Sequence, residues 1–156
     1  MAKKIVHLKE GDAAPDFSAV ATGGIKMSLS DLKGKNVILY FYPRDDTPGC
    51  TKEACGFRDH FAEIKKRGAL VLGVSKDSAK SHEKFADKFH LPFPLLSDVD
   101  HKIAEAYGVW GEKKFMGRTY MGMNRVTFLI GGEGRIKKIW REVKPDEHAQ
   151  EVLAAL

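Results

Sequence analysis

Residues 37–42 have the sequence VILYFY, a continuous apolar and aromatic run that Pro43 ends. Residues 69–74, ALVLGV, form a second such run, which ends at the polar Ser75. Unbroken apolar runs are typical of strands that are covered on both faces. Both runs are therefore predicted to be central strands of a sheet.

A helix is predicted between these two strands. Apolar residues recur at three- and four-residue steps from Ala54 to Ile64. The basic residues 65–67 follow in the last turn, and Gly68 lies beyond it, which is typical of a helix end. Strand, helix and strand in this order form a right-handed parallel unit, so the sheet is expected to be at least partly parallel.

The segments outside this unit complete the predicted sheet and its helical cover. Further helices are expected at residues 79–89, 100–107 and 145–156, with a short apolar stretch at 95–96. Residues 126–130 and 135–140 flank the sequence GGEG and predict an antiparallel hairpin. Residues 15–30 predict a smaller hairpin about Thr22-Gly23-Gly24, followed by a helical turn that opens at Ser30.

This order of elements is that of a thioredoxin-like α/β fold. It consists of a mixed central sheet flanked by helices, with an N-terminal hairpin extension. A length of 156 residues favours one domain, and 43% hydrophobic residues are enough for a core. No internal repeat, low-complexity tract or linker is visible, so residues 1–156 are predicted to form a single domain.

The charge distribution limits the classes of partner. The 26 basic and 21 acidic residues leave a net charge of +5, but no basic run exceeds three residues. Short runs are typical of a solvated helix face and disfavour nucleic-acid binding. Residues 1–7 lead into no apolar stretch of signal-peptide length, and nothing later approaches the ~20 apolar residues of a membrane span. We expect a soluble, cytoplasmic monomer with neither nucleic-acid nor membrane partners.

The chain has only two cysteines, Cys50 and Cys55. They are too few for the disulfide framework of a small secreted domain and too close together to connect distant elements. In a chain that packing can hold together, a close pair indicates redox chemistry or metal binding before a structural bridge.

Both cysteines lie in segment 43–55, PRDDTPGCTKEAC, where the first central strand passes into its helix. Thr47 is a favourable N-cap residue, and Pro48 then occupies the first helical position. Cys50 falls in the first turn, where unpaired N–H groups and the positive end of the helix dipole favour a thiolate. A lone cysteine can also be a small buried apolar residue. The Thr, Pro and Gly residues beside Cys50 instead predict an exposed first turn.

This segment resembles the active site of a known family. The pattern Pro43-x-x-x-Thr47-x-x-Cys50 is similar to the peroxidatic motif of peroxiredoxins. A second cysteine five residues on, Cys55, resembles the bacterioferritin comigratory protein branch, also called the Q type. The similarity continues through residues 107–113, 115–117 and 125–130, so it spans nearly the whole chain. Residues 131–132, both glycine, depart from the acidic residue that the family often has after this strand.

The resemblance implies an antioxidant thiol peroxidase that reduces hydrogen peroxide and organic hydroperoxides and needs no cofactor or metal. Cys50 would attack the peroxide, and Cys55 would condense with the resulting sulfenic acid to a disulfide. Thioredoxin or a similar dithiol protein would reduce that disulfide. Thr47 would hydrogen-bond beside the thiolate, Pro43 would shield the pocket, and Arg125 would supply positive charge. Without the resemblance, Arg125 would be interpreted as a surface arginine at a strand start.

A protein dithiol-disulfide oxidoreductase is a first alternative function. Such enzymes place two residues between their cysteines, so that both lie at one helix start. Four residues separate Cys50 from Cys55, which disfavours this alternative.

A metal site formed by Cys50, Cys55 and His60 is a second alternative. Five residues turn a helical side chain by about 140°, so these side chains leave the shared face that one metal needs. The other histidines lie in polar stretches and are expected to be solvated: His7, His82, His90, His101 and His148.

A binding module without turnover is the third alternative. Trp110, Phe115 and Tyr120 would then contact a partner. The simpler interpretation is that these aromatic residues pack near the active-site loop.

Overall fold

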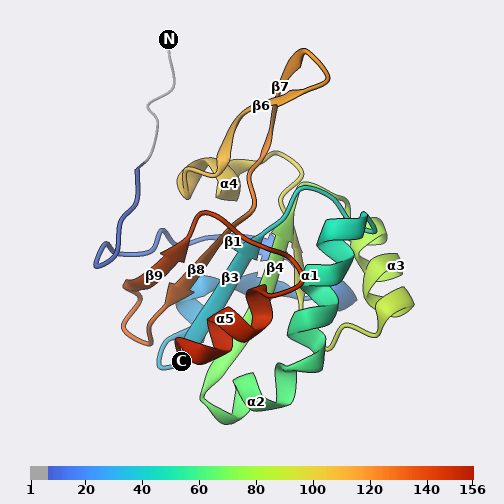
Figure 1. The fold of residues 1–156 in the computed structure, drawn as a ribbon. Helices are drawn as coiled ribbons and strands as arrows, with labels where there is room; N and C mark the ends of the chain where they lie inside the picture. Colours follow the sequence, from blue (N-terminus) through green and yellow to red (C-terminus); the bar gives the residue numbers. More distant parts are fainter. Residues whose placement is uncertain (1–6) are drawn as a thin grey trace.

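The computed structural model describes residues 7–156. The basic residues 1–6, on which the expectation of no signal peptide partly rests, lie outside the described residues. At the centre is a five-stranded sheet with the order β5-β4-β3-β8-β9 (Figure 1). Its strands are Asn36–Phe41 (β3), Ala69–Ser75 (β4), Leu95–Ser97 (β5), Val126–Ile130 (β8) and Ile136–Trp140 (β9). Strands β3, β4 and β5 are mutually parallel, whereas β8 is antiparallel to both β3 and β9. The predicted mixed sheet is confirmed.

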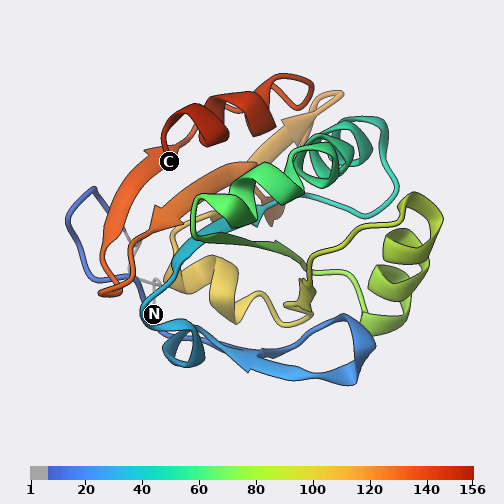
Figure 2. The ribbon, with the colours of Figure 1, turned by 90° about the horizontal axis from the view of Figure 1, so that it is seen from below.

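Two apolar layers cover the sheet because alternate residues of a strand point to opposite faces. Ile38 and Tyr40 of β3 lie in one buried cluster, and Leu39 and Phe41 lie in the other. Figure 2 shows helices on one side of the sheet and α4 with the N-terminal segment on the other. The first side carries α1 (Pro48–Asp59), α2 (Phe61–Lys66) and α5 (His148–Ala154), and α3 (Ala79–Phe89) joins the same cluster through Phe85.

The second face is covered by α4 (Lys102–Ala106) and the predicted N-terminal hairpin. That hairpin pairs β1 (Ser18–Val20) with β2 (Lys26–Ser28), and a 3₁₀ turn at Thr22–Gly24 joins them. A further 3₁₀ helix, Leu29–Leu32, follows where the sequence predicts a helical turn. Gly23 and Gly24 have φ values of 84° and 75°, which glycine adopts without strain.

The single helix expected between β3 and β4 is divided in two. Helix α1 ends at Asp59 and α2 begins at Phe61. His60 between them has left the helical region, with ψ near 7°. Apolar periodicity continues across this bend because both helices lie on the same sheet face, so the pattern alone does not reveal it.

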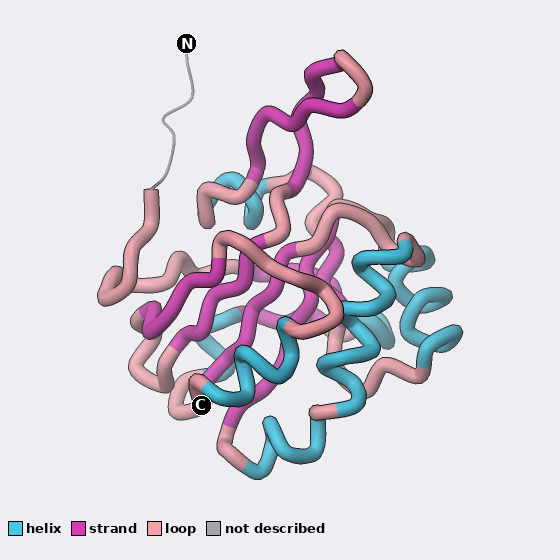
Figure 3. Tube along the Cα trace, in the orientation of Figure 1, coloured by secondary structure: helices cyan, strands magenta, loops and turns pink. Residues whose placement is uncertain are grey.

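A third hairpin was not predicted. It pairs β6 (Trp110–Phe115) with β7 (Arg118–Met123) and projects away from the sheet (Figure 3). Phe115 is 65% exposed and Tyr120 is 47% exposed, so the expectation that they pack near the active-site loop is wrong. Trp110 stacks on His101 at 4.1 Å between ring centroids. Both faces of the tip meet solvent, so the apolar alternation that marks a half-buried strand is missing.

A helix that crosses a bilayer must be about 20 residues long and predominantly apolar. Within residues 7–156, none is both long and apolar enough to cross a membrane.

Candidate active site

The segment between β3 and α1 folds as its local sequence predicts. Thr47 has extended backbone at the N-cap position, and Pro48 is the first residue of α1. The Thr47 side chain does not cap the helix, however, because its hydroxyl donates to the carbonyl oxygen of Arg44 at 2.9 Å. The hydroxyl proton is thereby committed to the loop. The Thr47 oxygen remains able to accept a hydrogen bond from a bound molecule.

Cys50 lies in the first turn of α1, but its thiol is not exposed. The residue is 1% exposed and belongs to the apolar cluster of Tyr40, Ala54 and Phe57. The prediction of an exposed first turn is therefore wrong for Cys50, although Pro48 beside it is exposed. By helix geometry the N–H groups of the first turn have no intrahelical partner, so donors lie next to the thiol.

Arg125 meets Cys50 from the opposite side. Its Nη2 lies 3.3 Å from the Cys50 Sγ, although 75 positions separate the two residues. Antiparallel pairing of β8 with β3 sets Val126 opposite Phe41 and brings Arg125 to the carboxyl end of β3. A Cβ at Gly49 would lie 3.2 Å from Nη2, so glycine here leaves room for the guanidinium.

Glu53 is a site residue that the sequence analysis missed. Its Oε1 accepts from Arg125 Nη1 at 2.7 Å, and its side chain is fully buried. Burial raises the pKa of Glu53 to about 7, against the opposing charge and hydrogen bond of Arg125. The only sequence signal is its spacing of three from Cys50, which puts both on one helix face. A glutamate within a helix is usually solvated, and nothing local indicates that this one, in the second turn of α1, is buried.

We expect Glu53 to make stability depend on pH. The pKa of the Glu53 carboxyl is 4.5 when it is exposed and about 7 in the folded protein. Between these two pH values the folded state therefore retains a proton that the unfolded state has lost. The free energy of unfolding should therefore fall as pH rises through this window, by up to about 3 kcal/mol. Glu53→Gln should remove this loss. Denaturant unfolding at both ends of the window measures it, with exposed Glu63→Gln as the matched control, and an unchanged slope in Glu53→Gln would contradict the assignment.

The other two predicted residues of segment 43–55, Pro43 and Cys55, form no hydrogen bond with the Cys50 thiol. Pro43 follows β3 and is half-buried. Cys55 is half-buried in α1, and both cysteines are free thiols. In a wound helix, five residues separate them by about 7.5 Å of rise and about 140° of rotation. The structure therefore brings Cys50, Arg125 and Glu53 together and leaves Cys55 apart from them.

The histidines differ from the sequence expectation. His60 lies in the bend between α1 and α2, and its Nδ1 is 2.9 Å from the carbonyl oxygen of Gly56 in α1. His82 and His148 are buried, so the expectation that they are solvated is wrong. His148 Nε2 lies 2.7 Å from Thr127 Oγ1, and burial lowers the pKa of His148. Both histidines lie on the buried faces of their helices. Their neighbours in sequence are polar, so the sequence does not reveal this burial.

A helix-start thiol held against a half-buried arginine on a thioredoxin-like fold defines the thiol peroxidase class. Residues 10–139 match the family described as AhpC/TSA. The chain is 53% identical over 151 residues to a putative peroxiredoxin bcp of Coxiella burnetii, covering 97% of this chain and 100% of the relative. It is 48% identical over 146 residues to peroxiredoxin Bcp of Escherichia coli K12, covering 94% of each.

Solved structures agree with this relationship. A mutant of PrxQ from Xylella fastidiosa superimposes with a TM-score of 0.91 at 38% identity, covering 96% of both chains. The bacterioferritin comigratory protein of Xanthomonas campestris gives 0.85 at 42% identity, covering 89% of this chain and 88% of that one. The chain belongs to the AhpC/TSA family and, within it, to the peroxiredoxins of the bacterioferritin comigratory type. The predicted family and thioredoxin-like fold are confirmed.

Proposed function

We propose that this peroxiredoxin reduces hydrogen peroxide and organic hydroperoxides through Cys50 and Cys55, as a cytoplasmic monomer recycled by thioredoxin or a similar dithiol protein. The observation that carries the proposal is the 3.3 Å contact between Arg125 Nη2 and Cys50 Sγ. A guanidinium there lies close to the peroxide oxygen that the Cys50 sulfur attacks and can donate a hydrogen bond to the oxygen that leaves. The Xanthomonas relative has been studied for its alkyl peroxide reduction activity, which supports the organic substrates.

In the first step the Cys50 thiolate attacks one peroxide oxygen and the O–O bond breaks. The leaving oxygen takes a proton and departs as water or an alcohol, and Cys50 becomes a sulfenic acid. Arg125 and the first-turn N–H groups stabilise charge that moves onto the leaving oxygen. Thr47 accepts the hydrogen bond of the hydroperoxide O–H, because its own proton is donated to Arg44.

In the second step the Cys55 thiol attacks the sulfenic sulfur, an S–S bond forms and water leaves. An external dithiol then reduces the disulfide by exchange, which returns both thiols.

The experiment that tests the function couples NADPH consumption to thioredoxin reductase, thioredoxin and the protein. Hydrogen peroxide and an alkyl hydroperoxide are supplied in separate reactions. NADPH oxidation that requires both the protein and a peroxide is expected. Disulfide exchange with a protein substrate in the absence of peroxide, without peroxide turnover, would instead favour the dithiol oxidoreductase.

Cys55→Ser should still permit one turnover. Attack on peroxide needs only Cys50, so stopped-flow measurements should show a first phase at the wild-type rate. The enzyme should then stall, because no thiol in the chain can resolve the sulfenic acid, and trapping with a dimedone reagent should label Cys50. Loss of the first phase would show that Cys55 has another role.

Formation of the disulfide should unwind the start of α1. A disulfide needs Cα atoms usually about 4.4 to 6.8 Å apart, which the wound helix does not allow. Ala54 and Phe57 in this segment are fully buried, and Glu53 in the same segment forms an ion pair with Arg125. Unwinding therefore also disrupts the packing of these two side chains and the ion pair. Oxidised protein should show lower helicity by circular dichroism and faster amide exchange over residues 47 to 57. Identical helicity and exchange in the two redox forms would contradict this step.

A further inference from the structure

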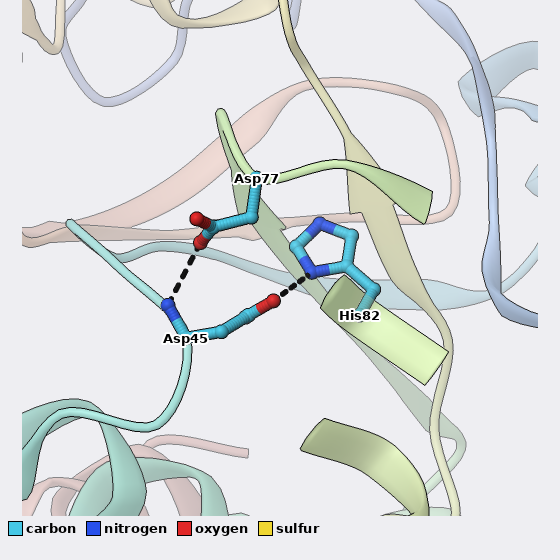
Figure 4. Close-up of side chains that lie close together, drawn as sticks. All are labelled: Asp45, Asp77 and His82. Atoms are coloured by element: carbon cyan, nitrogen blue, oxygen red, sulfur yellow. Dashed lines mark hydrogen bonds and ion pairs between the residues drawn. The ribbon is translucent and has the colours of Figure 1, made fainter. Parts of the chain in front are cut away.

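His82 is a fully buried histidine for which the proposed reaction has no role. It lies in the first half of α3, and both ring nitrogens face acceptors. Nε2 lies 3.0 Å from the carbonyl oxygen of Leu96, and Nδ1 lies 2.7 Å from Asp45 Oδ2 (Figure 4). A carbonyl oxygen can only accept, so Nε2 carries a proton. The contact on the other side then holds one proton between the imidazole and the carboxyl of Asp45.

Asp45 is held from several other elements as well. Its Oδ1 accepts from the hydroxyl of Tyr42 at 2.6 Å, and its Oδ2 accepts from Ser81 Oγ at 2.7 Å. Its backbone N–H donates to Asp77 Oδ2 at 2.7 Å, and the same oxygen accepts from Ser75 Oγ at 2.7 Å. Strand β4, helix α3 and the end of β3 thus converge on one residue of the active-site loop.

Asp45, Asp77 and His82 each offer one atom to a metal, and these atoms lie within 4.8 Å of one another. Each of the three side chains is already joined to protein donors or acceptors, as the dashed lines of Figure 4 show for two of the contacts. A metal would have to break these hydrogen bonds to bind. The geometry therefore favours a hydrogen-bonded anchor over a metal site.

The anchor lies two residues before Thr47, which is proposed to accept a hydrogen bond from the peroxide. Asp45 comes between Arg44, whose carbonyl oxygen orients the Thr47 hydroxyl, and Asp46, which has a φ of 54°. A positive φ costs free energy in a residue other than glycine and persists only where the surroundings enforce it. The hydrogen bonds of Asp45 to Tyr42, Ser81 and His82 connect the loop of residues 43–47 to the buried core.

We propose that His82 is a positioning residue for peroxide reduction, acting through Asp45. It holds the loop of residues 43–47 in the conformation that orients Thr47 beside Cys50. The inference rests on the proposed function, because Thr47 matters only if a peroxide binds there. The reaction would then also depend on His82, a residue of α3 that does not contact the Cys50 thiol.

Two amide variants separate the two sides of the ring. Asparagine places an N–H near the position of Nδ1 and can still donate to Asp45, whereas glutamine reaches the position of Nε2 and can donate only to Leu96. Each variant loses one hydrogen bond of His82, so both should lower the Tm to a similar extent. His82→Gln should slow the oxidation of Cys50 by hydrogen peroxide by about tenfold to a hundredfold, because loop misplacement misaligns Thr47. His82→Asn should remain within about threefold of wild type.

Alkylation of Cys50 by iodoacetamide and amide exchange at residues 45–47 provide readouts besides peroxide reduction. His82→Gln should raise amide exchange there, with no fall in alkylation, because alkylation does not use Thr47. Equal peroxide rates in both variants and wild type, or an equal loss in both variants, would overturn the proposal. If wild-type protein itself fails to reduce peroxide, the proposed function fails, and amide exchange in the two variants still decides whether His82 positions the loop.

Discussion

Cys50→Ser is expected to abolish peroxide consumption. The Cys50 thiolate is the nucleophile of the proposed reaction, and a serine hydroxyl stays un-ionised at neutral pH and attacks oxygen poorly. The substitution replaces one small buried side chain by another, and Arg125 can donate to the new hydroxyl, so the fold should be retained. Loss of activity can then be attributed to the nucleophile rather than to unfolding.

Consumption of hydrogen peroxide by purified protein measures this effect, with circular dichroism to verify folding. Cys55→Ser is the matched control, because it makes the same atomic change in the same helix and should retain the first turnover. If Cys50→Ser kept even a tenth of the wild-type rate, the assignment of the nucleophile would be wrong.

Arg125→Ala is expected to lower the rate of Cys50 oxidation by about a hundredfold to a thousandfold, which is typical for loss of one preorganised donor to a transition state. The prediction from the sequence is little loss of stability, because the guanidinium is proposed to act on the transition state. The structure changes that expectation. Glu53 is fully buried against the half-buried Arg125, so removing the guanidinium leaves a buried carboxyl without its hydrogen-bond donor, which costs about 1 to 3 kcal/mol.

The two effects can be separated with a double variant. Adding Glu53→Gln to Arg125→Ala removes the unpaired carboxyl, so the free energy of unfolding should recover while the peroxide rate stays low. Arg118→Ala at the exposed start of β7 is the control for loss of one positive charge. A double variant that recovers both stability and rate would assign Arg125 to structure and leave the reaction without its proposed guanidinium.

The sequence by itself determined the architecture and the place of the chemistry. Unbroken apolar runs marked β3 and β4, and Thr47 with Pro48 marked the start of the helix that carries Cys50. These features depend on neighbours along the chain, through side-chain periodicity, caps and fixed backbone angles. They can therefore be recognised without knowing what packs against them. The hairpin of β6 and β7 escaped because its tip is solvated on both faces.

Only the tertiary structure decided which polar groups surround the thiol. Arg125 reaches Cys50 from 75 positions away because β8 pairs with β3 in one register, and that pairing buries Glu53. His82 reaches Asp45 across 37 positions because α3 packs against the same loop. An isolated Glu, Arg or His in a sequence usually indicates a solvated side chain. Burial and a partner change its chemistry, and both come from elements that meet only when the sheet is assembled.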